Sequence, residues 1–274
     1  MIWRRERVMK KYIGFNFKYN SDLYERAKEI KKVGFDGVFL YAHHDPQQSI
    51  KAVHSVGLEV ETLHLPYKVS DGVVKNPFLV NYLWEEEKQN KNFKAMLFQN
   101  VAFARKNGIK TLVMHVTAGD NPPPFSEYGV DFLDGLVNEC ERYGIVLCIE
   151  NTRRLDYIMQ LFKRIHSPYL KFCFDMGHAN CMTKNLNSFP WETFGQYLYC
   201  LHISDNNGVS DEHLIPFSGN IDWKHILQTV YRYNPFLNLT LEVHATQQQR
   251  TMLTQRQYLV QCYNSLQMLE KYIV

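Results

Sequence analysis

The sequence lacks the features that mark several protein classes. None of its six cysteines forms a CxxC pair, and three lie inside apolar runs, which indicates reduced thiols in a cytoplasmic setting and no disulfide framework. No apolar stretch approaches the roughly 18 residues of a membrane-spanning helix, so we expect no membrane association. The first eight residues, MIWRRERV, are not followed by the apolar segment of a signal peptide. We expect residues 1–8 to form a poorly ordered extension and residues 9–274 to form the domain.

The chain also has little excess charge and no obvious linker. It contains 31 Lys and Arg residues against 28 Asp and Glu residues, a net charge of +3. This balance does not indicate nucleic acid binding, and the one local basic cluster lies at residues 4–11. No low-complexity tract divides the sequence, so we expect a single domain.

Short apolar segments alternate with segments of helical period along the whole chain. The helical segments include residues 21–34, 86–108, 125–144 and 223–234. A glycine stands before the next apolar segment at Gly34, Gly57, Gly108 and Gly144, which is typical of a helix end. The apolar segments, rich in Val, Ile, Leu, Phe and Cys like strands buried on both faces, are residues 12–17, 37–42, 59–65, 111–116, 145–151, 170–175, 199–204 and 239–244.

Eight strands that alternate with helices predict an α/β protein with a (β/α)₈ TIM barrel. The competing fold is an open doubly wound sheet, which favours a GxGxxG loop after the first strand, whereas NFKYNSDLYER stands there. Residues 246–274 are expected to close the barrel as its last helix, or to present a dimer face in a homo-oligomer.

Polar residues stand at the ends of the predicted strands, where barrel enzymes carry their active sites. Carboxylate and imidazole groups suit a divalent ion, whether manganese, magnesium, cobalt or zinc. Three carboxylates that converge without a cation would repel one another, so a metal site is predicted. The other histidines, His43, His44, His54, His166 and His225, are interpreted as surface or helix residues. The residues of the predicted site are His64, His115, Glu150, Asp175, His178, His202, Asp211, His213 and Glu242.

Each of these residues also has a simpler interpretation. A strand-end histidine can bond to a loop, Asp175 can cap a turn, and Glu150 can pair with Arg153 or Arg154. Glu242 can form a salt bridge at the rim. Polar groups at six successive strand ends are harder to explain in this way, because apolar strands gain nothing from them.

The chain resembles the xylose isomerase-like barrel superfamily, which contains sugar and sugar-phosphate isomerases and epimerases and also endonuclease IV-type DNA repair enzymes. The resemblance covers essentially the whole predicted barrel. The order and spacing of the motifs are specific for the superfamily and less so for one member. The segments that carry it are LHLPY (63–67), MHV (114–116), CIEN (148–151), FDMGHAN (174–180), LHISDNNGVSDEHLIPFSGNIDW (201–223) and LEVH (241–244).

In the sugar branch, the resemblance implies one catalytic divalent metal ion. Its ligands map to Glu150, Asp175, His202 and Glu242, and the two glutamates are also the acid/base pair. They would move a proton beside the substrate carbonyl through an enediolate, which the metal stabilises. His178 and the pair Asp211 and His213 would then bind substrate hydroxyls or hold their loop.

In the endonuclease branch, the resemblance implies three zinc ions held by all nine residues of the predicted site. The repair enzymes continue the fifth-strand motif as ENTAGQG, whereas this chain has ENTRRLDY. They continue the third-strand motif as Tyr-Leu-x-Asn-Leu, whereas this chain has LPYKVSDGVV, and its loops are not notably basic. We therefore expect a metal-dependent sugar isomerase or epimerase, with abasic-site phosphodiester hydrolysis as the alternative and a non-catalytic binding protein third.

The expected partner is a small sugar or sugar phosphate, and nucleic acid is not expected. Arg153 or Arg154 could bind a phosphate, although a surface role is equally open. Aromatic residues near the rim could line a pocket, although aromatic side chains are more often part of a core. These aromatic residues are Tyr41, Tyr67, Trp84 and Phe125.

Overall fold

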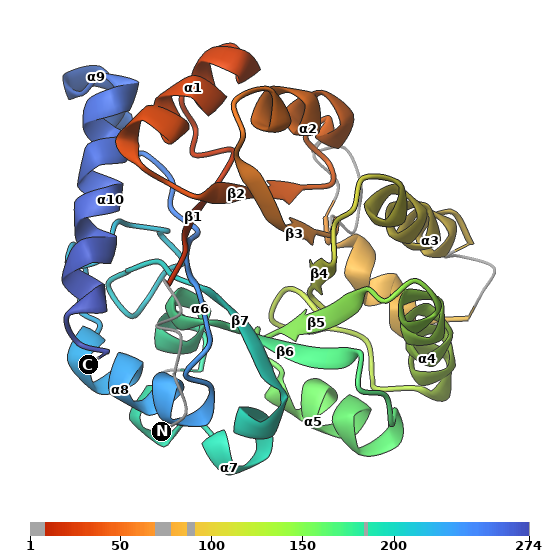
Figure 1. Ribbon diagram of the computed structural model, residues 1–274. Helices are drawn as coiled ribbons and strands as arrows, with labels where there is room; N and C mark the ends of the chain where they lie inside the picture. The colour runs from red at the N-terminus through yellow and green to blue at the C-terminus, as the bar shows by residue number, and fades with distance from the viewer. Residues whose placement is uncertain (1–8, 69–77, 87–90, 184–185, 274) are drawn as a thin grey trace, which may run out of the picture.

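The predicted strands form one barrel of eight parallel strands (Figure 1). The computed structural model describes residues 9–68, 78–86, 91–183 and 186–273, so the predicted extension at residues 1–8 lies outside the described residues. The strands are β1 (Lys11–Gly14), β2 (Gly37–Tyr41), β3 (Glu59–His64), β4 (Thr111–Met114), β5 (Val146–Glu150), β6 (Leu170–Asp175), β7 (Leu198–His202) and β8 (Leu239–Leu241).

The strand order closes the sheet on itself. The hydrogen-bonded order is β7-β6-β5-β4-β3-β2-β1-β8, with every named pair parallel. The remaining gap is bridged just beyond β7, where the Ile203 amide donates to the Thr240 carbonyl at 2.9 Å and the Glu242 amide donates to the Ile203 carbonyl at 3.0 Å. The barrel prediction is therefore confirmed, and the open sheet is excluded.

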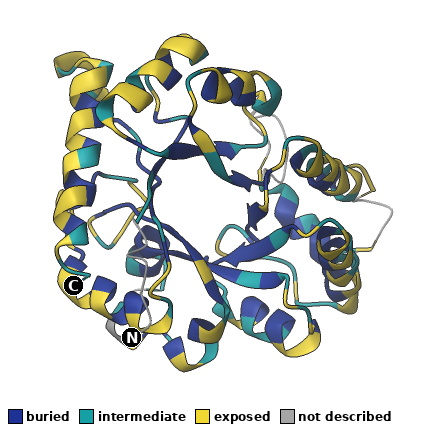
Figure 2. Cartoon of the chain, viewed as in Figure 1, coloured by how far each residue is buried: buried dark blue, intermediate teal, exposed yellow. Residues whose placement is uncertain are grey.

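Helices surround the barrel and turn their buried faces toward it (Figures 1 and 2). Among the described residues, the short 3₁₀ helices η1 (Leu79–Trp84), η3 (Leu186–Ser188) and η4 (Gly195–Tyr197) interrupt the connections. No helix among the described residues has the length and apolar character that crossing a bilayer requires. The α-helices are α1 (Leu23–Val33), α2 (Pro46–Ser55), α3 (Lys91–Lys106), α4 (Glu127–Arg142), α5 (Leu155–Arg164), α6 (Met176–Cys181), α7 (Trp191–Phe194), α8 (Trp223–Tyr233), α9 (Gln247–Met252) and α10 (Gln255–Glu270).

The four glycines expected at helix ends have the left-handed backbone that such turns require. Their φ angles are 114° at Gly34, 68° at Gly57, 72° at Gly108 and 63° at Gly144. An L-residue with a side chain adopts this region only at a cost in strain, so glycine fixes the point where each helix turns toward the next strand.

The C-terminal segment forms two helices rather than the single last helix that we expected. Thr246 caps α9 and Thr254 caps α10, and each forms a capping box with the glutamine three residues later. These two capping boxes lie eight residues apart. Each one marks the start of a new helix and interrupts the helical hydrogen bonds before it, so the segment forms two helices.

Small side chains fill the barrel below its mouth. Val113, Cys148, Cys173 and Cys200 form one buried cluster from four adjacent strands. All six cysteines are free and buried, so they act as small apolar groups of the interior.

Candidate metal centre

The polar residues predicted at strand ends converge at one mouth of the barrel. His64, Glu150, Asp175 and His202 are the last residues of β3, β5, β6 and β7. His115 and Glu242 directly follow β4 and β8 and are buried as well; all six residues are at most 7% exposed. Parallel strands end on the same side of the barrel, so their terminal side chains meet there although they lie far apart in sequence.

Glu150 lies at the centre of this group and is fully buried. One carboxylate oxygen, Oε2, is 2.9 Å from His64 Nε2 and 3.0 Å from His115 Nε2. The other oxygen, Oε1, is 2.9 Å from His202 Nδ1. Imidazoles therefore surround Glu150 on both sides, and the alternative in which it pairs with an arginine is wrong.

The donor atoms fall into groups that have the size of metal sites. Within each group the candidate ligand atoms all lie within 4.8 Å of one another. Glu150 belongs to two of the three groups formed by oxygen and nitrogen donors, so its carboxylate can bridge them. These groups are Glu150, Asp175, His202 and Glu242; His64, His115 and Glu150; and His178, Asp211 and His213.

Backbone carbonyls fix the tautomer of three of these histidines. In each ring Nδ1–H donates to a carbonyl, so Nε2 can donate to a carboxylate when the ring is protonated and can offer its lone pair to a metal ion when the ring is neutral. This is the arrangement that metal-binding histidines adopt. The bonds run from His64 to Leu65 at 2.8 Å, from His178 to Asn151 at 3.0 Å and from His213 to Glu242 at 2.9 Å.

Three buried polar atoms of the centre have no hydrogen-bond partner among the described residues. They are Asp175 Oδ2, His202 Nε2 and Glu242 Oε2, the last of which lies 3.0 Å from His202 Nδ1 as an ion pair. Burial, together with the charges of Glu150 and Glu242, raises the pKa of Asp175 to about 8, although His178 opposes the shift. An unpartnered buried carboxylate oxygen costs several kcal/mol in general, and a bound cation would remove that cost. The residues present therefore fit a divalent ion held by Glu150, Asp175, His202 and Glu242.

The two oxygens of Asp175 have different partners. Oδ1 accepts a hydrogen bond from the His178 amide at 2.5 Å and caps α6, while Oδ2 is the unpartnered atom. The Asp175 amide in turn donates to Asn151 Oδ1 at 2.7 Å, which fixes the end of β6. The capping and ligand interpretations of Asp175 are thus compatible.

Charges within the centre shift the pKa values of its members in opposite directions. Burial raises the pKa of Glu150, but the neighbouring His202 and His115 hold it well below its ordinary value. Burial lowers the pKa of His178, yet Asp175 and Asp211 raise it well above its ordinary value. The metal-free centre thus places cationic imidazolium among carboxylates, where a bound divalent ion would supply the positive charge instead.

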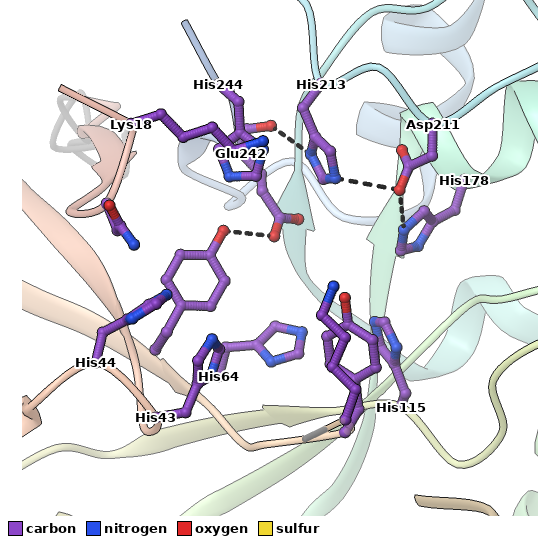
Figure 3. A pocket seen from close by; sticks show the side chains of 14 residues that line it. Lys18, His43, His44, His64, His115, His178, Asp211, His213, Glu242 and His244 are labelled. Carbon is purple, nitrogen blue, oxygen red and sulfur yellow. Dashed lines mark hydrogen bonds and ion pairs between the residues drawn. The ribbon is translucent and has the colours of Figure 1, made fainter. Parts of the chain in front are cut away.

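A cavity of about 310 Å³ opens above the centre (Figure 3). Tyr41 extends into it and its hydroxyl donates to Glu242 Oε1 at 2.7 Å. Tyr67 also lines the cavity, so two of the four proposed rim aromatics are placed as expected. Seven of the chain's eleven histidines line it, namely His43, His44, His64, His115, His178, His213 and His244.

The remaining candidates lie elsewhere. Trp84 and Phe125 pack against each other, with ring centroids 4.8 Å apart, and do not line the cavity. The Arg153 guanidinium pairs with Asp120 at 3.0 Å in an exposed position, and Arg153 is not among the lining residues either. Arg154 pairs with Asp156 at 2.7 Å.

The cavity wall also contains residues that the sequence pattern did not single out. His43 and His44 are exposed, as expected for surface residues, and they also border the cavity after β2. Asn16 and Lys18 after β1, and Lys68 after β3, also line it. The signal was available, because these residues follow strand ends in the same way as the residues that were identified.

Comparisons with known proteins agree with the barrel fold. Residues 27–261 match the family described as "Xylose isomerase-like TIM barrel", and the chain belongs to this family. Among curated proteins, it is 25% identical over 196 residues to the uncharacterized protein y4fM of Sinorhizobium fredii, which covers 65% of this chain and 60% of that protein. It is 31% identical over 133 residues to the uncharacterized protein MJ1311 of Methanocaldococcus jannaschii, covering 42% and 45%. The chain thus spans about half the length of these relatives.

Solved structures with the same fold include sugar epimerases. A D-psicose 3-epimerase from Clostridium cellulolyticum H10 matches with a TM-score of 0.76 and 15% identity, covering 97% of this chain and 99% of that one. The 3-keto-D-glucoside 4-epimerase YcjR from E. coli matches with a TM-score of 0.69 and 18% identity, covering 96% and 99%. At these identities the likeness establishes the shared fold.

Proposed function

We propose that the protein is a divalent-metal-dependent isomerase or epimerase of a small sugar or sugar phosphate. The supporting observation is the group of Glu150, Asp175, His202 and Glu242, whose donor atoms lie within 4.8 Å of one another below a cavity of about 310 Å³. That volume suits a small molecule. The cytoplasmic setting expected from the reduced cysteines is part of the same proposal.

The two glutamates divide the proton transfer between them in this proposal. A bound divalent ion would polarise the carbonyl and hydroxyl oxygens of the substrate and make the neighbouring C–H more acidic. Glu242 lines the cavity, and we assign it removal of that proton, with its carboxylate oriented by the hydroxyl of Tyr41. Glu150 is buried among its imidazoles, and we assign it return of the proton to the neighbouring carbon or to the opposite face.

Exchange of solvent deuterium into the substrate tests this proposal. The protein is loaded with each candidate ion and incubated in D₂O with a panel of ketoses and their phosphates, and incorporation is followed by NMR. We expect Glu242→Gln and Glu150→Gln to lower exchange by at least about 10²-fold, the lower end of the usual contribution of an acid/base group.

Glu192→Gln provides the matched control, because Glu192 is an exposed carboxylate of α7 outside the cavity lining. This variant should exchange deuterium at the wild-type rate. A complete absence of exchange across the panel with every ion, or exchange that survives Glu242→Gln, would contradict the proposed function.

Zinc-dependent phosphodiester hydrolysis is the second candidate, and one observation favours it. The two further donor groups flank the central one, so the centre has room for three ions rather than one. A bridging role for Glu150 between such ions agrees with its contacts to His64 and His115 on one side and His202 on the other.

Two measurements separate the candidates. Metal analysis after zinc loading gives one ion per chain for the sugar enzyme and three for the hydrolase. Efficient nicking of an abasic-site duplex that chelator abolishes would favour the hydrolase.

A further inference from the structure

The carboxylates that line the cavity, Asp211 and Glu242, are already paired with groups of the protein. Asp211 Oδ2 is 3.3 Å from His178 Nε2 and 3.1 Å from His213 Nε2, and Glu242 accepts from Tyr41. Asp211 and Glu242 therefore do not neutralise positive charges on other groups that line the cavity.

Two lysines also line the cavity, and they have no such pairing. Within the described part of the chain, neither Lys18 nor Lys68 forms an ion pair or a hydrogen bond, although both line the cavity. Lys68 Nζ lies over the face of Tyr67, 5.3 Å from the ring centroid. Figure 3 shows the Lys18 side chain extending over the cavity toward His244. Two unpaired ammonium groups in the lining of a small cavity attract an anion.

The backbone presents Lys18 in a conformation that the surrounding structure must enforce. Its φ angle is 67°, a left-handed value that is unfavourable for a lysine. The buried Arg26 of α1 fixes this loop, because its guanidinium donates to the carbonyls of Phe15, Tyr19 and Ser21. Strained residues of this kind persist where the structure over-determines them, and they concentrate at binding sites.

A neutral histidine also lines the cavity. Partial burial lowers the pKa of His43 to about 4, and His44, His64 and Lys68 lower it further in the same direction. At neutral pH this ring is an uncharged N–H donor, which can bond to an anion that the lysines attract.

We infer that the substrate is a polyol or keto sugar with an anionic end, a phosphate or a carboxylate, that binds between Lys18 and Lys68 while its hydroxyl and carbonyl groups face the metal centre. This inference rests on the proposed function and narrows its substrate class. It also assigns Lys18 and Lys68 as residues that determine specificity.

Calorimetric titration with three probes of equal carbon length tests the inference. Glycerol 3-phosphate, D-glycerate and glycerol share a three-carbon body and differ at one end. We expect at least one anionic probe to bind about ten-fold or more tightly than glycerol, and the phosphate and carboxylate arms to identify the preferred group. Binding should weaken as salt is added, because the attraction is screened.

Charge-neutral variants locate the bound anion. Lys18→Gln and Lys68→Gln should each weaken the anionic probe several-fold and leave glycerol unchanged, whereas Lys163→Gln should change neither. Lys163 is the matched control, an exposed lysine in the last turn of α5 outside the cavity. The far-ultraviolet circular dichroism spectrum of each variant confirms that it is folded.

Three results would overturn the inference. They are equal binding of all three probes, a loss in Lys163→Gln as large as in the cavity variants, and full binding in the Lys18→Gln/Lys68→Gln double variant, which would place the anion on the metal centre. The binding measurement does not require turnover. The inference can therefore be supported even if deuterium exchange is never found. Exchange on neutral sugars without dependence on the lysines would overturn only this inference.

Discussion

At the scale of single residues, the hydrogen-bond partners of a carboxylate inside the barrel decide what it does. Asp175 and Glu61 are both carboxylates on the inner side of the barrel, and burial raises the pKa of each. Asp175 leaves one oxygen unpartnered in the candidate centre. Glu61 instead accepts hydrogen bonds from Asn238 Nδ2, at 2.9 Å, and from Thr240 Oγ1. Since β3 and β8 are not neighbours, these bonds cross the barrel interior.

Glu61 should make the stability of the protein depend on pH. Its pKa is raised to about 7 in the folded state by burial, against an ordinary value of about 4.3 in the unfolded chain. Between these values the folded state holds a proton that the unfolded state releases, so the free energy of unfolding falls as pH rises from about 4 to 7. The glutamine of Glu61→Gln is neutral at every pH, so the free energy of unfolding of this variant does not fall for this reason. Urea unfolding should therefore show the variant gaining stability relative to the wild type between pH 5 and pH 8.

The comparison is internal, because all other titrating groups are present in both proteins. The Thr240 hydroxyl can accept a bond from the new amide, so the substitution need not leave a buried group unpartnered. An unchanged difference in stability between pH 5 and pH 8 would show that Glu61 does not titrate in this range.

At the scale of helices and strands, the regular elements could be predicted from the sequence, whereas the loops could not. Apolar runs and glycine stops are local signals, so the eight strands and the helix ends at Gly34, Gly57, Gly108 and Gly144 were found. Strand ends in a closed barrel share one mouth, which placed the site residues together. The path of a loop depends on contacts from other elements instead, such as Arg26 of α1 holding the carbonyls around Lys18.

The histidines of the second loop show the same limit. Nothing in the segment YAHHDP states that His43 and His44 turn toward the cavity, because that direction is set by the chain that packs around the loop after β2. The extra residue in β3, opposite Val38 and Leu40, is equally invisible in the sequence. It is a feature of pairing between strands and not of either strand alone.

Replacing glycine with alanine should change the stability of the protein in opposite directions at two positions. A Cβ on Gly37 of β2 would lie 2.2 Å from the Glu59 carbonyl oxygen on the neighbouring strand β3, so Gly37→Ala must push two strands apart. A Cβ on Gly135, inside α4, would meet no atom within 4 Å. We expect Gly37→Ala to lose about 1–3 kcal/mol of stability. We expect Gly135→Ala to gain about 0.5–1 kcal/mol, because alanine restricts the unfolded chain and favours the helix.

Midpoints of chemical unfolding, measured side by side, check this pair. Changes of equal sign in the two variants would show that intrinsic propensity, and not the space around each position, controls the effect.

At the scale of the whole molecule, closing the barrel concentrates ionisable groups that the chain keeps apart. Glu150, Asp175 and Glu242 come from three separate strands and are buried together with His64 and His202. Apolar burial elsewhere in the barrel must offset the unfavourable energy of this cluster. A cation that binds the folded form and not the unfolded chain relieves that energy, so folding and metal binding are linked.

Divalent ions should therefore raise the midpoint of thermal unfolding. An ion at about 100 times its dissociation constant adds roughly 2.7 kcal/mol, which corresponds to a rise of roughly 5 °C for a domain of this size. Chelator should reverse the rise. Asp175→Asn should abolish it, because the amide retains an oxygen to cap α6 but loses the charged oxygen that faces the centre. Asp131→Asn, which changes an exposed carboxylate on α4, should keep the full rise. Scanning calorimetry with magnesium, manganese, cobalt and zinc measures each shift and ranks the ions. If every ion left the unfolding midpoint of the wild-type protein unchanged, the cluster would have to be stabilised by protons alone, and the metal centre would be wrong.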